Sequence, residues 1–195
     1  ISKMSGKKMS LRYAVEDSKN GCAYSLYNII TPKVGLSYIE NMNFSKIVQQ
    51  DYTLSSGLGG LHHGTNTVEM ANAYSTLENH GEYRQADCIS SILDASGNEI
   101  YEEPESKTVY TRSASDQMTD ILEGVLNSSA GTAKGLKWSS ASDVAAAAKT
   151  GTTNDNNVAW FCGYTPYYTI SVWVGYDYPK SVKGLWGNTY PAYIW

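Results

Sequence analysis

The sequence lacks the features of a membrane span and of a nucleic-acid surface. None of its apolar runs approaches the roughly 20 residues that cross a bilayer. Acidic residues outnumber basic ones by 19 to 15, and the formal net charge is −4. Because a domain that binds nucleic acid presents a basic face, this balance gives no support to nucleic-acid binding.

Cysteine and histidine are scarce, with three of each in the chain. Cys22, Cys88 and Cys162 lie far apart and form no C-x-x-C pair, which excludes a zinc ribbon and a thioredoxin motif. We interpret these cysteines as buried or inert thiols. We expect no metal site and no cofactor.

The glycine-rich stretch 55–66 lacks the Lys-Ser/Thr ending of a phosphate-binding loop. It is therefore a weak signal for a nucleotide site. We interpret the stretch as a tight turn that leads into a helix.

The length and composition are those of one domain with a core. Hydrophobic residues make up 42% of the 195 positions, and no internal repeat or low-complexity linker divides the chain. The chain begins with Ile1 rather than Met, so we expect it to be a fragment or a processed product that has lost an upstream anchor.

Apolar residues at helical spacing, with capping residues before them, predict a series of helices. Five helices are predicted. The first begins at Leu11 behind a Ser10 cap, the second is Ala23–Ile30 before Pro32, and the third is Ser37–Asn43. The fourth follows a cap at Asn66 or Thr67, and the fifth is 114–127 with a cap at Ser113 or Ser115. The helix signal of the first segment stops at residues 17–21, a run of helix-breaking residues.

Alternating apolar residues predict strands in the last quarter of the chain. Residues 168–176 alternate between large apolar and small or polar side chains, and 157–164 forms a similar run before the turn at Thr165 and Pro166. We therefore predict a β-hairpin, with residues 145–153 as a third strand. Residues 87–102 are predicted to form two further short strands around a turn.

The third strand is unusual because it is built from alanine and glycine, which are poor strand formers. One explanation is that a ligand backbone approaches the strand closely, and the other is that a helix packs closely on it. Lys149 favours the ligand. A cation beside the hydroxyls of Thr150 and Thr152 suits a substrate that carries a carboxylate and an acyl carbonyl, whose oxygen a backbone N–H near Thr152 can stabilise.

Lys149, Thr150 and Gly151 also spell K-T-G, one of three motifs shared by penicillin-binding proteins and serine β-lactamases. The other two motifs are S-x-x-K and S-x-N, and Ser18-Lys19-Asn20 fits S-x-N in the order that the family uses. Residues 9–20, 57–83 and 147–177 resemble the matching segments of bifunctional (class A) penicillin-binding proteins. The resemblance covers nearly the whole chain.

The resemblance implies a role for each matched residue. Ser18 is expected to be the middle hydroxyl of a proton path, Asn20 to bind the substrate amide, and Lys149 to hold Ser18. Thr150, Gly151 and Thr152 are expected to bind the terminal carboxylate of a D-Ala-D-Ala stem peptide or of a β-lactam. The Thr152 N–H would supply half of an oxyanion hole.

The first motif, which carries the nucleophile, is missing. In the family it lies several tens of residues before S-x-N, but only 17 residues precede Ser18. Ser5, Gly6, Lys7 and Lys8 fit the S-x-x-K pattern, yet they lie too close to Ser18 for two elements that face one cleft. We interpret them as a solvated loop and expect the nucleophile on a preceding segment or a second chain.

We therefore predict that residues 1–195 are the C-terminal part of one transpeptidase domain. The expected fold is a layered α/β (α+β) arrangement, an antiparallel sheet with helices on both faces. The resemblance implies a peptidoglycan-cross-linking enzyme on the extracytoplasmic face of a bacterial membrane, with an anchor and a glycosyltransferase domain outside this chain. A D,D-carboxypeptidase or β-lactamase-type hydrolase, a non-catalytic β-lactam sensor and an interaction module remain as alternatives.

Overall fold

The computed structural model describes residues 6, 8–136 and 144–195. Its helices are α1 (Leu11–Glu16), α2 (Asn20–Ile30), α3 (Pro32–Asn41), α4 (Thr67–Glu78), α5 (Arg112–Asn127) and α6 (Tyr190–Ile194), with short 3₁₀ turns η1 (Gln49–Asp51) and η2 (Ser56–Leu58). Its strands are β1 (Glu82–Tyr83), β2 (Lys107–Thr108), β3 (Ala147–Thr152), β4 (Val158–Tyr164) and β5 (Thr169–Gly175). Ser5 and Lys7 of the S-x-x-K-like stretch lie outside the described residues, so the interpretation of that stretch as a loop stays a prediction.

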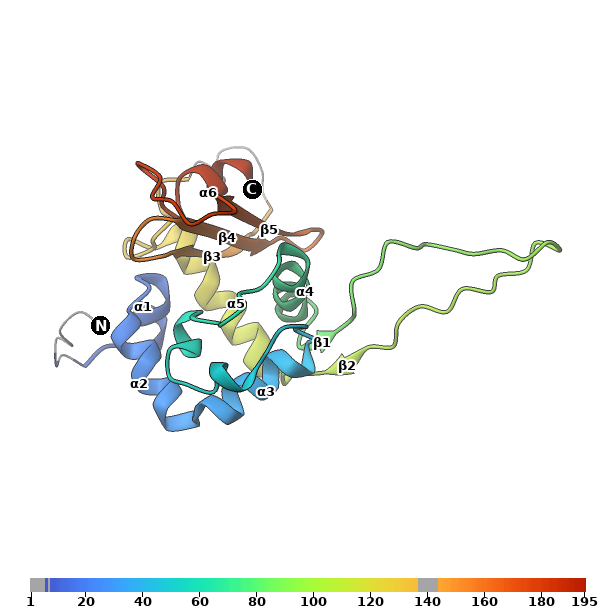
Figure 1. Ribbon diagram of the computed structural model, residues 1–195, viewed down its shortest axis with the longest axis horizontal. Helices are drawn as coiled ribbons and strands as arrows, with labels where there is room; N and C mark the ends of the chain where they lie inside the picture. The colour runs from blue at the N-terminus through green and yellow to red at the C-terminus, as the bar shows by residue number, and fades with distance from the viewer. Residues whose placement is uncertain (1–5, 7, 137–143) are drawn as a thin grey trace.

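The central sheet has the strand order β3-β4-β5 and is antiparallel throughout. This confirms the predicted hairpin and its third strand. Helices α4 and α5 cover one face of the sheet, and α6 covers the other (Figure 1). Side chains of β4 point to both faces of the sheet. Tyr164 packs beside Tyr74 of α4, whereas Phe161 packs against Trp195 after α6. The fold class predicted from the sequence is therefore confirmed.

The alanines of β3 are explained by helix packing. Ala147 and Ala148 are only 2% and 0% exposed, and they share the core with Leu122 and Val125 of α5. Successive side chains point to opposite faces of a strand, so one alanine faces the α5 side and the other faces the α6 side. Small side chains let both layers lie close against the strand. From Lys149 onward the strand is less buried. The approach of a ligand backbone there stays a prediction.

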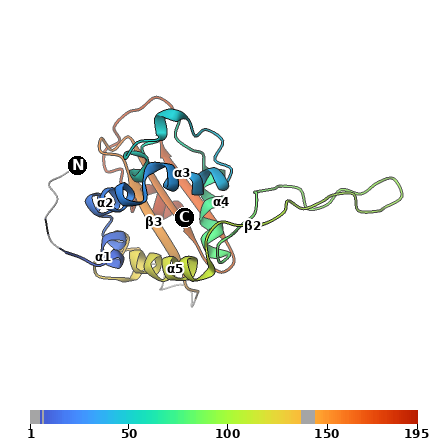
Figure 2. The ribbon, with the colours of Figure 1, turned by 90° about the horizontal axis from the view of Figure 1, so that it is seen from below.

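Residues 84–106 form a long arm that projects from the body of the molecule (Figures 1 and 2). The prediction of two strands within 87–102 was wrong. The arm holds one isolated bridge, Leu93 to Glu99, and the ladder lies at its base, between β1 and β2. The turn itself is present, because the Asp94 carboxylate accepts hydrogen bonds from the backbone N–H groups of Ser96 and Asn98.

Helix ends show where capping was predicted well and where it was not. The Ser10 hydroxyl accepts from the Tyr13 N–H at 3.1 Å, as expected. The Asn66 side chain caps α4 in the same way. The predicted caps of α5 were wrong, because Thr111 caps that helix. Helix α3 also begins earlier than predicted, since Pro32 fits the first turn of a helix as well as it ends one.

Candidate active site

Ser18 sits in the turn that ends α1. Its N–H donates to Val15 O and the Lys19 N–H donates to Ala14 O, which is the hydrogen-bond pattern of a Schellman C-cap. The cap places Ser18 in the left-handed region, with φ of 52°. Glycine usually occupies that position because a Cβ is strained there. A serine held in this conformation is consistent with a functional role for its hydroxyl.

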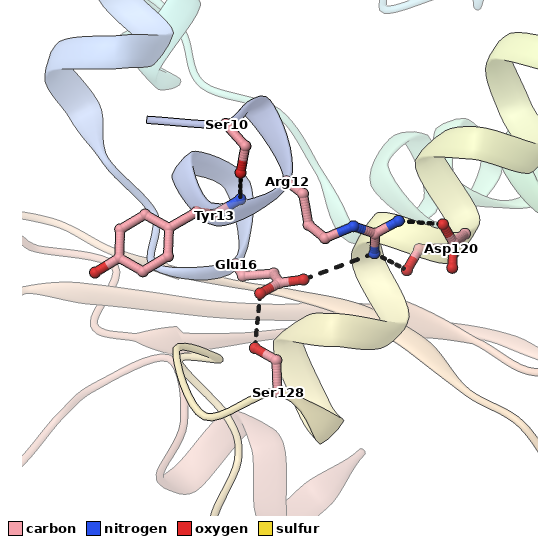
Figure 3. Close-up of polar contacts among 6 residues, drawn as sticks. All are labelled: Ser10, Arg12, Tyr13, Glu16, Asp120 and Ser128. Atoms are coloured by element: carbon pink, nitrogen blue, oxygen red, sulfur yellow. Dashed lines mark hydrogen bonds and ion pairs between the residues drawn. The ribbon is translucent and has the colours of Figure 1, made fainter. Parts of the chain in front are cut away.

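A buried carboxylate fixes α1 on α5, as Figure 3 shows. The Glu16 side chain accepts a hydrogen bond from the Ser128 hydroxyl at 2.7 Å and lies 3.7 Å from the Arg12 guanidinium. The same guanidinium pairs with the side chain and backbone carbonyl of Asp120 on α5. These contacts hold the end of α1, and therefore Ser18, in one place relative to the sheet.

Lys149 reaches Ser18 from the sheet. Its Nζ donates to Ser18 Oγ at 2.8 Å and to the Thr150 carbonyl at 2.9 Å. The lysine is half-buried, and burial lowers its pKa to about 8. A lysine with this pKa changes its charge near neutral pH, which suits a group that handles a proton.

Thr150 and Thr152 point to the opposite side of β3 from Lys149, because side chains alternate along a strand. The Thr150 hydroxyl lies 2.7 Å from the Thr132 hydroxyl, and the Thr152 hydroxyl accepts from the Gly187 N–H at 2.9 Å. A Cβ on Gly187 would lie 2.8 Å from the backbone N and O of Gly151, so the chain at position 187 lies directly on the strand.

These residues line one cleft of about 1110 Å³. It contains all six residues predicted from the sequence: Ser18, Asn20, Lys149, Thr150, Gly151 and Thr152. Asn20 is the first residue of α2 and is exposed. Among the described residues that line the cleft, Lys149 is the only cation and Asp155 the only carboxylate. The cleft thus joins a cation, several hydroxyls and one strand of the sheet.

An apolar pocket of about 740 Å³ adjoins this cleft and shares Lys149 to Thr153 with it. Its other walls include Ile39 of α3, Met42 just after α3, Met70 of α4, Met118 of α5 and Trp160 of β4. A large apolar volume therefore lies directly beside the polar groups of the cleft.

The comparisons with known proteins agree with the geometry. The family model described as the penicillin binding protein transpeptidase domain matches residues 2–190. This chain belongs to that transpeptidase family. It is 32% identical over 188 residues to penicillin-binding protein 4 of Bacillus subtilis, covering 96% of this chain and 29% of that protein. It is 34% identical over 176 residues to penicillin-binding protein 1A of Clostridium novyi, covering 89% of this chain and 20% of that protein.

Solved transpeptidase-family structures share the fold. PonA1 of Mycobacterium tuberculosis, in complex with penicillin V, superposes with a TM-score of 0.80 at 24% identity, over 100% of this chain and 57% of that chain. Penicillin-binding protein 1A of Haemophilus influenzae superposes with a TM-score of 0.75 at 19% identity, over 98% of this chain and 36% of that chain. The chain thus has the penicillin-binding protein fold and spans less than a third of the length of the two curated relatives.

The parts of the cleft that were missed from the sequence include the turn from Ser55 to Gly60, Thr132, and residues 186–188. The glycine-rich turn was recognised, but nothing in its pattern placed it at the cleft. Thr132 follows α5 without a motif of its own. Gly187 carried no signal because its role depends on contact with a strand more than thirty positions away.

Two kinds of feature are not found in the part of the chain that the structure describes. No group of three or more histidine, cysteine and acidic side chains there could hold a metal ion. No helix among those residues is both long and apolar enough to cross a bilayer. Of the cysteines, Cys162 is buried, Cys22 is half-buried and Cys88 is exposed.

Proposed function

We propose that this chain supplies the substrate-binding half of the active site of a peptidoglycan D,D-transpeptidase. The observation that carries the proposal is the 2.8 Å contact between Lys149 Nζ and Ser18 Oγ, in the cleft that Thr150 and Thr152 also line. Membership of the transpeptidase family supports it. So does the likeness to PonA1, whose structure holds penicillin V.

In this proposal the C-terminal carboxylate of a D-Ala-D-Ala stem peptide binds at Thr150, Gly151 and Thr152. The two hydroxyls donate to the carboxylate, and Lys149 adds positive potential. The Thr152 N–H donates to the carbonyl oxygen as it becomes negative. Asn20 binds the amide of the peptide from the opposite wall. A β-lactam would bind in the same way because it presents a carboxylate and an acyl carbonyl.

The attacking group in this account is a serine on a segment outside the 195 residues, with its own basic lysine. The serine oxygen forms a bond to the carbonyl carbon of the penultimate D-alanine, and its proton passes through the Ser18 hydroxyl to the leaving nitrogen. D-Alanine departs and leaves a serine ester. The amine of a second stem peptide then attacks the ester, forms the cross-link and regenerates the serine.

The apolar pocket beside Lys149 supports an off-chain nucleophile. A helix carrying a serine must bury an apolar face to hold that serine in place, and the pocket offers apolar walls that meet the cleft at Lys149 to Thr153. We propose that the nucleophile segment packs there. We also propose that a membrane anchor and a glycosyltransferase domain precede it, on the extracytoplasmic face of the cell membrane.

A product analysis tests the proposed function. The full-length protein is incubated with a stem pentapeptide ending in D-Ala-D-Ala, with and without an acceptor amine, and the products are identified by mass spectrometry. We expect a cross-linked product that requires the acceptor. Release of D-alanine at the same rate without acceptor would identify a D,D-carboxypeptidase. Opening of a β-lactam with turnover would identify a β-lactamase-type hydrolase.

Two further outcomes would also overturn the proposed transpeptidase function. Acylation by penicillin without any turnover of peptide would identify a β-lactam sensor. If the protein is not acylated by penicillin and does not bind the peptide, the chain would be identified as an interaction module.

A further inference from the structure

Thr132 lies where the chain doubles back after α5. A Cβ on Gly131 would come within 2.4 Å of Val125 O, and the Ala133 N–H donates to that same carbonyl. The turn therefore lies tightly against the end of the helix. It brings the Thr132 side chain to the wall of the cleft, beside Thr150.

Each polar group of Thr132 is engaged by a different part of the molecule. Its backbone N–H donates to Glu16 O at 3.1 Å, at the end of α1. Its carbonyl accepts from the Asn188 side chain at 3.0 Å, and its hydroxyl lies 2.7 Å from the Thr150 hydroxyl. Thr132 thus connects the Ser18 turn, the strand that carries Lys149 and the 184–189 segment.

The direction of the hydrogen bonds matters for the cleft. A hydroxyl has one proton to donate and two lone pairs that accept. At Thr152 one lone pair is taken by the Gly187 N–H, so its proton remains available for a ligand. At Thr150 the proton is equally available only when Thr132 donates and Thr150 accepts.

We propose that Thr132 is a positioning residue that sets the Thr150 hydroxyl to donate to the carboxylate of a bound ligand. The inference rests on the proposed function. The Asn188 side chain fixes the Thr132 carbonyl from the solvent side, and Glu16 O fixes the Thr132 N–H from the core side. In this arrangement Thr132 donates to Thr150, and the hydroxyls of Thr150 and Thr152 both point their protons into the cleft. An anionic ligand favours this arrangement because it accepts from both hydroxyls.

The experiment compares a ligand that carries a carboxylate with its uncharged methyl ester. Full-length protein is acylated with benzylpenicillin or with its methyl ester, which lacks the carboxylate. We expect Thr132→Val to lower the second-order acylation rate constant for benzylpenicillin about tenfold, the upper end for one lost hydrogen bond between neutral groups, because the Thr150 hydroxyl loses the partner that orients it. The rate constant for the ester should change less than about twofold. Thr132→Ser keeps the hydroxyl and should restore the wild-type ratio.

Thr119→Val is the matched control. The Thr119 hydroxyl also lies 2.8 Å from another hydroxyl, that of Tyr164, but Thr119 does not line the cleft. The substitution should leave the ratio of the two rate constants unchanged. Asn188→Ala, at an exposed position, provides a second test if Thr132→Val does not fold, and should lower acylation selectively for benzylpenicillin.

An equal fall for both ligands, or no fall in either variant, would overturn the inference. A wild-type protein that neither ligand acylates would overturn the proposed function itself, and the two failures are therefore distinguishable.

Discussion

Lys149 Nζ lies 2.8 Å from Ser18 Oγ, although 131 positions separate the two residues in the sequence. The contact joins the turn after α1 to the open end of β3. It places a hydroxyl whose proton can move beside a cation whose pKa is lowered by burial.

Removal of this cation should be costly for acylation. We expect Lys149→Ala in the full-length protein to lower the rate of penicillin acylation by at least about tenfold, as loss of a group in a proton path does. Stopped-flow or gel-based acylation measures it. Lys134→Ala is the control, because Lys134 is an exposed lysine that donates to the Ser129 carbonyl. An unchanged rate in a folded Lys149→Ala protein would disprove the role of the lysine.

The pH dependence should report the charge of Lys149. Burial lowers the pKa to about 8, so the ammonium form is lost as the pH rises through that value instead of near 10.5. Acylation that uses the ammonium should therefore decline above about pH 8. Lys149→Arg stays protonated and should show no decline in that range, although its rate at pH 7 should be lower because the guanidinium has a different shape. A rate that rises through pH 8 would mean that the neutral amine is the active form.

Ser18 should show a conflict between stability and activity. Both Ser18→Gly and Ser18→Ala remove the hydroxyl that Lys149 contacts, so both should lose most acylation. Only glycine relieves the left-handed backbone at φ of 52°. We expect Ser18→Gly to have a free energy of unfolding about 1 kcal/mol higher than Ser18→Ala. Urea denaturation measures the difference, and equal stabilities would contradict the strain assigned to this turn.

Gly187 should tolerate no side chain. A Cβ there would lie 2.8 Å from the backbone of Gly151 and from the Thr150 Cβ, so Gly187→Ala should push the 184–189 segment off β3. We expect a loss of about 1–3 kcal/mol in the free energy of unfolding and weaker penicillin binding. Gly135→Ala is the control, since nothing lies within 4 Å of a Cβ at that position. Equal effects of the two substitutions would rule out the close approach.

Much of the sheet and of the candidate site could be predicted because the signals are local. Alternation along β4 and β5 follows from side-chain period, and the apolar stripe of α5 follows from helical spacing. Asn66 caps α4 through a bond to a residue three positions away. The K-T-G and S-x-N motifs are also local, so six of the residues that line the cleft could be named before their contacts were known.

The features that were missed depend on contacts between distant segments. Ala147 and Ala148 are small because the layers on both faces of the sheet pack closely on the strand, and no local pattern distinguishes that from the approach of a ligand. The strands expected in the arm failed because alternation there has no sheet to join. Thr132 and Gly187 acquire their roles from partners 18 and 35 positions away, which single-sequence patterns do not reveal.

The most direct test of the central claim is to locate the β-lactam adduct. The full-length protein is incubated with penicillin, digested and analysed by peptide mass spectrometry. The account predicts one drug mass on a serine outside residues 1–195, with every peptide of these residues unchanged. A drug mass on Ser5, Ser18 or any other serine of this chain would contradict the division of the active site between two segments.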